Sequence, residues 1–197
     1  MIEISPESKL AQIAFPLYIH EQAKKRKGLF IYDASILGKG DKYYFGEFCS
    51  NRWGWDSFFT ELAMCESVSS YFESIIKGEN PFKWKFGVAV RGFNLDQGDD
   101  RWPTEGWKMN WLDEGDKNTW VYDLKLKNGE AVSCGTCYDL VVFTGGGDTI
   151  NSAVNRAYEA EEGFSFSNMI ARPRFDFLST DYSSSIPNRY EYAKDLI

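Results

Sequence analysis

The chain has 197 residues, of which 43% are hydrophobic and 26% charged, so it is long enough for one compact domain or two small lobes. Its 29 acidic side chains outnumber 22 basic ones, and the net charge of −7 argues against a broad nucleic-acid surface, which needs clustered Lys and Arg. No apolar run approaches the roughly 20 residues of a membrane helix, and the opening MIEISPESKL lacks a signal-peptide pattern. We therefore expect a cytoplasmic protein that binds neither nucleic acid nor membrane.

The first quarter of the sequence predicts a helix followed by a hairpin. Apolar residues recur at helical spacing over residues 8–27, with Ser8 as a cap and Pro16 as a point where the helix could kink. Residues 29–37 and 42–49 then read as two strands joined by a turn over residues 38–41.

The rest of the chain predicts a mixture of helices and short strands. An apolar stripe indicates a helix over residues 58–77, which Gly78 ends. Strands are expected at 86–90, 108–111, 120–126 and 140–143, and a second helix at 149–161. The three glycines at 145–147 are expected to form a tight turn before that helix, because they lack the Lys and Ser/Thr of a phosphate loop. The tail from 175 to 197 shows no clear period.

Two residue clusters invite a functional interpretation that we weigh against packing. Cys134 and Cys137 form a CxxC motif, but structural zinc generally needs four ligands, and the one histidine, His20, is far upstream. We expect reduced thiols without zinc or a disulfide. The tryptophans between residues 101 and 111 could stack on sugars or bases, or could fill the core of a small β domain, which we favour.

The predicted hairpin carries the residues best suited to chemistry. Asp33 and Glu47 lie in its two strands, and a turn near residue 40 brings them close together. Neighbouring carboxylates repel unless a cation or a shared proton joins them, and Mg²⁺ bound by one or two carboxylates and nucleotide phosphates is one reason for such a pair. Asn51 could add an amide oxygen, and Arg52 could face phosphate. Alternatively, Asp33 pairs with a Lys or Arg, and Glu47 faces solvent.

Three segments, in order, resemble the phosphoribosylamine–glycine ligase family of ATP-grasp enzymes and, less closely, biotin carboxylase. The first is LFIYDASIL…YYFGEFCSNRWGWD, which is similar to strands ending in Glu-Phe-Asn-x-Arg-Phe-Gly-Asp. The second is the helix ending IIKGENP, and the third is FTGGGDTINSAVNRAYEAEEGFSFSNMIARPRFD, including an Arg-x-Arg-x-Asp-like strand.

The resemblance implies an α+β fold in which residues 1–82 complete an ATP-grasp lobe and residues 83–197 form a β-rich C-terminal domain with one packed helix. It further implies a carboxylate–amine ligase of purine biosynthesis that uses ATP and Mg²⁺. Asp33, Glu47 and Asn51 would hold metal, and Arg52 would meet phosphate. No residue here is expected to act as a general base or nucleophile.

Two departures from the family pattern bear on this function. Cys49 stands where the family has Asn, unless a bulge brings Asn51 into place. The glycine-rich phosphate loop and the ATP-binding lysines of the ATP-grasp half are missing from the sequence, so we expect that half as a partner and expect the chain alone to be inactive. The alternatives are a non-catalytic partner module derived from the fold, and a carbohydrate- or nucleotide-binding β domain built around the Trp cluster.

Overall fold

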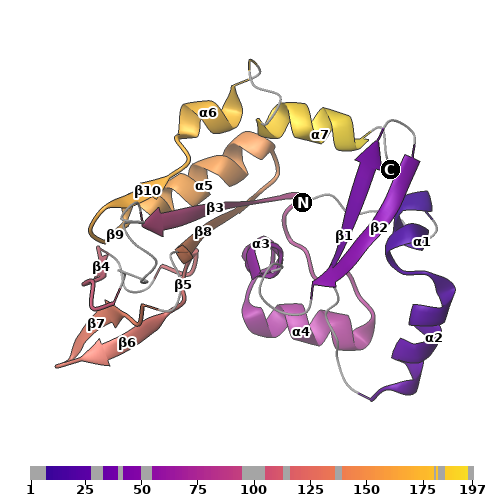
Figure 1. Ribbon diagram of the computed structural model, residues 1–197, viewed down its shortest axis with the longest axis horizontal. Coiled ribbons are helices and arrows are strands. Elements are labelled where there is room, and N and C mark those ends of the chain that lie inside the picture. The colour runs from indigo at the N-terminus through magenta and orange to yellow at the C-terminus, as the bar shows by residue number, and fades with distance from the viewer. Residues whose placement is uncertain are drawn as a thin grey trace. The chain divides into compact units, whose positions relative to one another are not determined.

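A computed structural model describes residues 8–27, 33–39, 42–49, 55–94, 105–112, 116–135, 139–179, 181 and 185–194. These residues form seven helices and ten strands, distributed over several small sheets (Figure 1). The α+β class predicted from the sequence is therefore confirmed. The part of the chain that the structure describes has no helix both long and apolar enough to span a membrane.

Contacts divide the chain into two compact units. One consists of Ile2–Trp55 with Asn188–Ile197, and the other contains Asp56–Pro187. The contact boundary thus lies near residue 55, whereas the resemblance places a lobe boundary at residue 82. The boundary at 82 stays a prediction.

The smaller unit begins with two short helices where the sequence predicts one. Helix α1 (Lys9–Ala14) is capped by the hydroxyl of Ser8, which accepts a hydrogen bond from the Ala11 N–H at 3.1 Å. Helix α2 (Leu17–Lys25) begins directly after Pro16, whose backbone is extended. Proline has no N–H to donate and its ring clashes with the preceding turn, so Pro16 divides the predicted helix rather than kinking it.

The hairpin of this unit pairs β1 (Asp33–Lys39) with β2 (Lys42–Cys49) in antiparallel fashion (Figure 1). Strand β2 has the predicted bounds, but β1 continues to Lys39, which pairs with Lys42. A register shift between Ser35 and Ile36 marks a bulge, because Gly46 falls between the partners of these two residues. Helix α1 packs on the hairpin, and the ring of Phe15, the residue after its last turn, lies 6.2 Å from the ring of Phe48.

The larger unit is organised around a four-stranded antiparallel sheet with the strand order β10-β3-β8-β5. Its strands are β3 (Phe86–Asn94), β5 (Thr119–Val121), β8 (Asp139–Gly147) and β10 (Met169–Ala171). Two further strand pairs join β4 (Asn110–Trp111) to β9 (Phe164–Ser165) and β6 (Leu124–Lys127) to β7 (Glu130–Ser133). The predicted strand over 120–126 is interrupted at Asp123, whose φ of 67° is left-handed.

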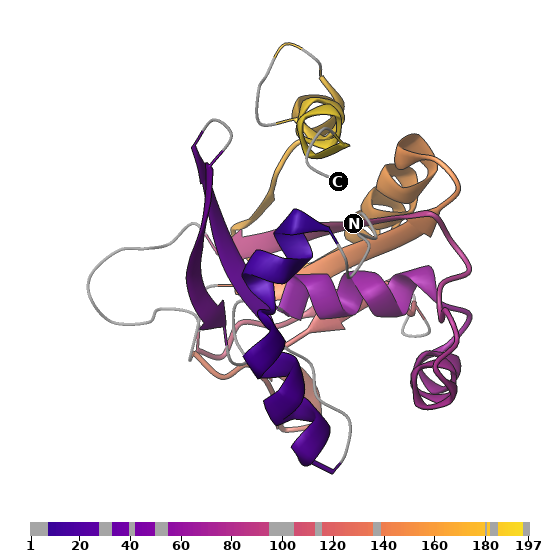
Figure 2. The same cartoon turned by 90° about the vertical axis from the view of Figure 1, so that its right-hand side faces the viewer.

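Helices cover both faces of this sheet. Helix α5 (Ile150–Glu162) lies along one face (Figure 2), where it packs with Val141 and Phe143 of β8. Residues of α3 (Trp55–Met64) and α4 (Val68–Lys77) pack with Val142 on the other. On that side the ring of Phe59 stacks on that of Trp120, with centroids 4.7 Å apart. Strand β8 is therefore buried from both sides, as the complete burial of residues 140–144 shows.

A capping box divides the helix that the sequence predicts over residues 58–77. The Ser67 hydroxyl accepts a hydrogen bond from the Ser70 N–H, and the Ser70 hydroxyl accepts one from the Ser67 N–H. These bonds satisfy N–H groups at the start of α4, so that a new helix begins there. The end of α4 is as predicted, with Gly78 in the left-handed conformation.

The glycines at 145–147 belong to strand β8, so the predicted turn is wrong. They pair with residues 86–88 of β3. A Cβ on Gly145 would lie 2.1 Å from the Ala153 carbonyl oxygen, and one on Gly146 would lie 2.4 Å from the Trp84 ring. The absence of side chains lets helix α5 and the segment around Trp84 approach the strand closely.

The C-terminal tail contains helices rather than the Arg-x-Arg-x-Asp strand that the resemblance suggests. Strand β10 ends at Ala171, and helix α6 (Arg174–Leu178) follows Pro173. Arg172 donates a hydrogen bond from Nε to Asp176 at 2.8 Å. Helix α7 (Ile186–Lys194) ends the described chain.

Candidate functional site

The β1–β2 hairpin places Glu47 and Asp33 as diagonal rather than direct neighbours. Glu47 lies opposite Ser35, and Asp33 lies opposite Cys49. The sequence argument put 33 and 47 opposite each other around a turn near residue 40, so the observed register is offset by two residues. Because residues two apart in a strand share a face, both acidic positions belong to the same face of the hairpin.

Glu47 is the best-described member of the predicted metal site. Its side chain is exposed, as a carboxylate that binds a partially hydrated cation must be. Of Asp33 only the backbone is described, while Asn51 and Arg52 lie outside the described residues. No group of three or more His, Cys, Asp or Glu side chains that could hold a metal occurs within the described ranges. The metal and phosphate assignments of these four residues therefore stay predictions.

Asp56, the last residue of the motif in the first segment, has a structural role. It lies at the start of α3 and accepts a hydrogen bond from Nε of Arg91, on β3. Nη1 of the same guanidinium lies 3.3 Å from the carboxylate of Asp139, on β8. Burial raises the pKa of Asp139, and the positive charge of Arg91 lowers it in part. The three charged groups join α3 to the sheet.

A second group of polar residues lies beside the C-terminal end of β8, beyond the residues that pair with β5. A cleft of about 240 Å³ opens there, which we name the Trp84 cleft. Its lining residues come from the end of α3 and the α3–α4 connection, the segment before β3, the turn before β5, strand β8 and helix α5: Ala63, Cys65, Glu66, Lys83, Trp84, Lys117, Asn118, Gly146 and Arg156.

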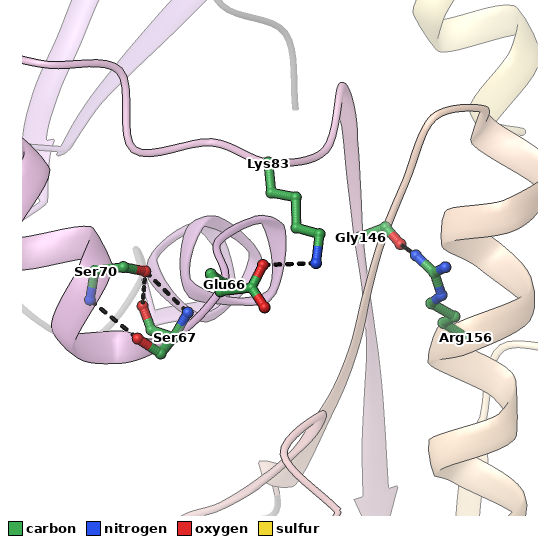
Figure 3. A network of polar contacts seen from close by, with 6 residues as sticks. All are labelled: Glu66, Ser67, Ser70, Lys83, Gly146 and Arg156. Atoms are coloured by element: carbon green, nitrogen blue, oxygen red, sulfur yellow. Dashed lines mark hydrogen bonds and ion pairs between the residues drawn. The ribbon is translucent and has the colours of Figure 1, made fainter.

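Trp84 organises the cations of this cleft. The Arg156 guanidinium lies 4.3 Å from the centre of the Trp84 ring, and the Lys83 ammonium lies 5.1 Å from it, both within the range of cation–π attraction. Arg156 also donates a hydrogen bond to the Gly146 carbonyl, while Lys83 pairs with Glu66 at 2.6 Å (Figure 3). The hydrogen bond from Lys83 lowers the pKa of Glu66.

Sequence reasoning did not find the Trp84 cleft. Its residues come from five segments between positions 63 and 156, and only the sheet brings them together. The one local signal is the adjacent pair Lys83-Trp84, which alone is too common to indicate a site.

The structure describes part of the CxxC motif and part of the tryptophan cluster. Cys134 carries a free thiol, and Cys137 lies outside the described residues, so their predicted lack of a bond stays a prediction. Trp107 and Trp111 are half-buried against the main hydrophobic core, as packing requires. Trp102 lies outside the described residues.

Comparison with known proteins gives evidence on the fold. No family model matches the chain, and no curated protein matches it either. Among solved structures it is similar to phosphoribosylamine–glycine ligase from Thermotoga maritima, with a TM-score of 0.52 and 19% sequence identity over 70% of this chain and 34% of that chain. The chain thus spans about a third of the length of that enzyme. The likeness shows that the chain shares its α+β fold with part of that enzyme.

Proposed function

We propose that the chain is the C-terminal part of an ATP- and Mg²⁺-dependent carboxylate–amine ligase of the phosphoribosylamine–glycine ligase type, acting in purine biosynthesis. The observation that carries the proposal is the fold likeness to that enzyme. The three sequence segments that resemble the same family support it independently, because they occur in the family's order.

In this proposal the β1–β2 hairpin contributes to the nucleotide site. Asp33, Glu47 and Asn51 hold Mg²⁺, and Arg52 binds phosphate. The exposure of Glu47 and the shared face of positions 33 and 47 suit a cation held by few protein oxygens and several waters. Bound Mg²⁺ neutralises the charge on the ATP phosphates. The chain's own residues would hold and orient the phosphates, which is the main protein contribution in phosphoryl transfer.

The ATP-grasp half is the partner in this proposal, whether it belongs to the same polypeptide or to another chain. Several large apolar side chains of the smaller unit are exposed, among them Leu17 at 73%, Leu37 at 64% and Tyr44 at 55%. The larger unit also exposes large apolar side chains, such as Ile76 at 78%, but we propose that those of the smaller unit form the surface that the partner covers. The same exposure favours a second candidate, a non-catalytic module that binds such a partner without contributing to catalysis.

Metal binding at the hairpin separates the two candidates. We would titrate Mn²⁺, a paramagnetic substitute for Mg²⁺, into the ¹⁵N-labelled chain with and without ATP, and follow the backbone amide signals. The ligase proposal predicts selective broadening of signals from β1 and β2. Glu47→Gln should abolish it, because the variant keeps the shape of the side chain and loses its charge.

Glu73→Gln is the matched control, since Glu73 is also an exposed glutamate but lies on α4. It should leave the broadening unchanged. Equal effects of the two variants, or no broadening at the hairpin, would contradict the metal assignment and favour the non-catalytic module. Without the ATP-grasp half we expect no ligase turnover, and calorimetry with a phosphate-release assay measures this.

A further inference from the structure

We propose that the Trp84 cleft binds a small oxyanion, either inorganic phosphate or the phosphate group of a monoester. Three cationic side chains, those of Lys83, Lys117 and Arg156, line it together with a single carboxylate, that of Glu66. The cleft therefore has a formal charge of +2 in a chain whose formal net charge is −7. A local concentration of positive charge against the overall balance attracts anions selectively.

An adjacent cleft of about 220 Å³ shows that this charge is a property of one cleft and not of the whole region. The neighbour shares Asn118 and Arg156 with the Trp84 cleft, but its other ionisable lining residues are Asp116 and Glu159. Two carboxylates and one guanidinium give it a formal charge of −1. An anion is therefore directed to the Trp84 side of Arg156.

The size of the Trp84 cleft limits the ligand. Its volume of about 240 Å³ is below the range of about 300–1,000 Å³ typical of pockets for drug-sized molecules. The cations beside Trp84 also occupy places where a base would stack on the ring. These features favour a small anion over a nucleotide.

Arg156 is positioned to donate to such an anion. Its guanidinium has five N–H donors in a rigid planar arrangement, and the Gly146 carbonyl takes a hydrogen bond from Nη1 (Figure 3). The Trp84 ring is its second partner, 4.3 Å from the guanidinium carbon. A pre-oriented guanidinium suits the geometry of phosphate oxygens.

Glu66 acts in this proposal as an internal counter-ion that the ligand displaces. Its side chain is 69% exposed, and that of its partner Lys83 is 47% exposed. Exposed ion pairs are weak and exchange readily with solvent ions. The Glu66 carboxylate therefore competes with an incoming oxyanion for Lys83, and its removal should strengthen binding.

The inference does not depend on the ligase proposal, because every lining residue lies in the unit that contains Asp56–Pro187. We would titrate potassium phosphate, at constant low ionic strength, into the ¹⁵N-labelled chain and follow the amides of the cleft. Saturable shifts are expected at Lys117, Asn118 and Gly146. Glu66→Gln should lower the Kd about two- to fivefold, and Lys117→Ala should raise it by a similar factor, as the strength of exposed charge pairs implies.

The control is an ion pair of the same geometry outside the cleft. Lys108 and Glu130 also lie 2.6 Å apart, with side chains 58% and 57% exposed. Glu130→Gln removes the same charge from the chain, so it should leave the Kd unchanged if the effect is local. Equal effects of Glu66→Gln and Glu130→Gln, or shifts that do not saturate, would overturn the proposal. In that case Arg156 serves only to join α5 to β8.

A second titration identifies the source of the oxyanion. Glycerol 3-phosphate presents the same charged group attached to a small organic body. Tighter binding of glycerol 3-phosphate than of inorganic phosphate would identify a phosphorylated metabolite as the ligand class, whereas weaker binding would identify the free ion. Failure of both to compete for the same shifted amides would contradict the proposed site.

Discussion

Replacing Gly145 by alanine tests the close packing of helix α5 on strand β8. The new Cβ would lie 2.1 Å from the carbonyl oxygen of Ala153 and 2.7 Å from the backbone nitrogen of Ala157. Both atoms belong to the backbone of α5, so no side-chain rotation can relieve the overlap. The helix would have to move away from the sheet.

The expected loss of stability follows from the contacts that α5 would lose on moving away from the sheet. Ala153, Val154 and Ala157 are completely buried in the same hydrophobic cluster as Phe143, so a displaced helix loses contacts along its whole inner face. Overpacking of a core typically costs about 1–3 kcal/mol, and occasionally more. Because neither the new Cβ nor the helix backbone can rotate away, we expect the unfolding free energy to fall by about 3 kcal/mol or more. This corresponds to a decrease in Tm of roughly 6–12 °C for a chain of this length.

Urea unfolding, followed by tryptophan fluorescence, measures this loss. Gly163→Ala, at the C-terminal end of α5, is the matched control. Its backbone is right-handed, with φ at −83°, and the nearest atom to an added Cβ lies 3.5 Å away, so alanine should stabilise the chain by about 0.4–1 kcal/mol. A Gly145→Ala variant as stable as the wild type would refute the packing argument, and would favour the surface turn that the sequence suggests.

Three further perturbations test other parts of the structure. Thr149→Ala removes the capping box that begins α5 and should lower the unfolding free energy by about 1 kcal/mol in the same urea assay; an unchanged midpoint would contradict it. Burial raises the pKa of Cys65 to about 11 from its ordinary 9.0, so iodoacetamide at pH 8 should alkylate it about 100-fold more slowly than in the urea-unfolded chain, as mass spectrometry would show. Arg91→Ala removes the guanidinium that pairs with the half-buried carboxylates of Asp56 and Asp139, which should cost about 1–3 kcal/mol at pH 7. Removing Arg91 raises the pKa of Asp139 further, and a raised carboxyl pKa costs stability as the pH rises above the ordinary 3.8, so the deficit should shrink near pH 4.

Elements that end on a local chemical signal could be predicted from the sequence. Ser8 caps a helix, Gly78 ends one in the left-handed conformation, and Thr149 begins α5, as expected. Strand β2 also has its predicted bounds. At the three helix boundaries the determining interaction lies within a few residues of the boundary.

Features that depend on distant contacts could not be predicted in this way. The apolar stripe of residues 58–77 continues across Ser67, so periodicity alone does not show the break that the capping box makes. A run of glycines indicates a turn on local grounds, whereas the close approach of Ala153 and Trp84 explains the strand at 145–147. Similarly, the sheet edge that collects the residues of the Trp84 cleft is a tertiary feature.

The candidate metal site falls between these two cases. A hairpin with carboxylates in both strands was predictable, because alternating apolar residues and a glycine turn are local signals. Its register was not, because Lys39 pairs with Lys42, so that the turn is centred between residues 40 and 41, and the bulge beside Ser35 shifts the pairing by one further residue. A single extra residue in one strand changes which residues face each other, and the sequence does not show where it is inserted.

Strand β8 has a consequence for how this sequence can vary in length. Val141 and Phe143 pack with the α5 cluster, while Val142 between them packs with the cluster of α3 and α4. Inserting or deleting one residue within the strand would turn every later side chain of the strand to the opposite face of the sheet, and so to the wrong cluster. Related sequences should therefore keep the length of β8 constant even where its residues differ. Insertions should instead accumulate in surface turns such as Asn128-Gly129, between β6 and β7, where the backbone is exposed and few contacts depend on the spacing.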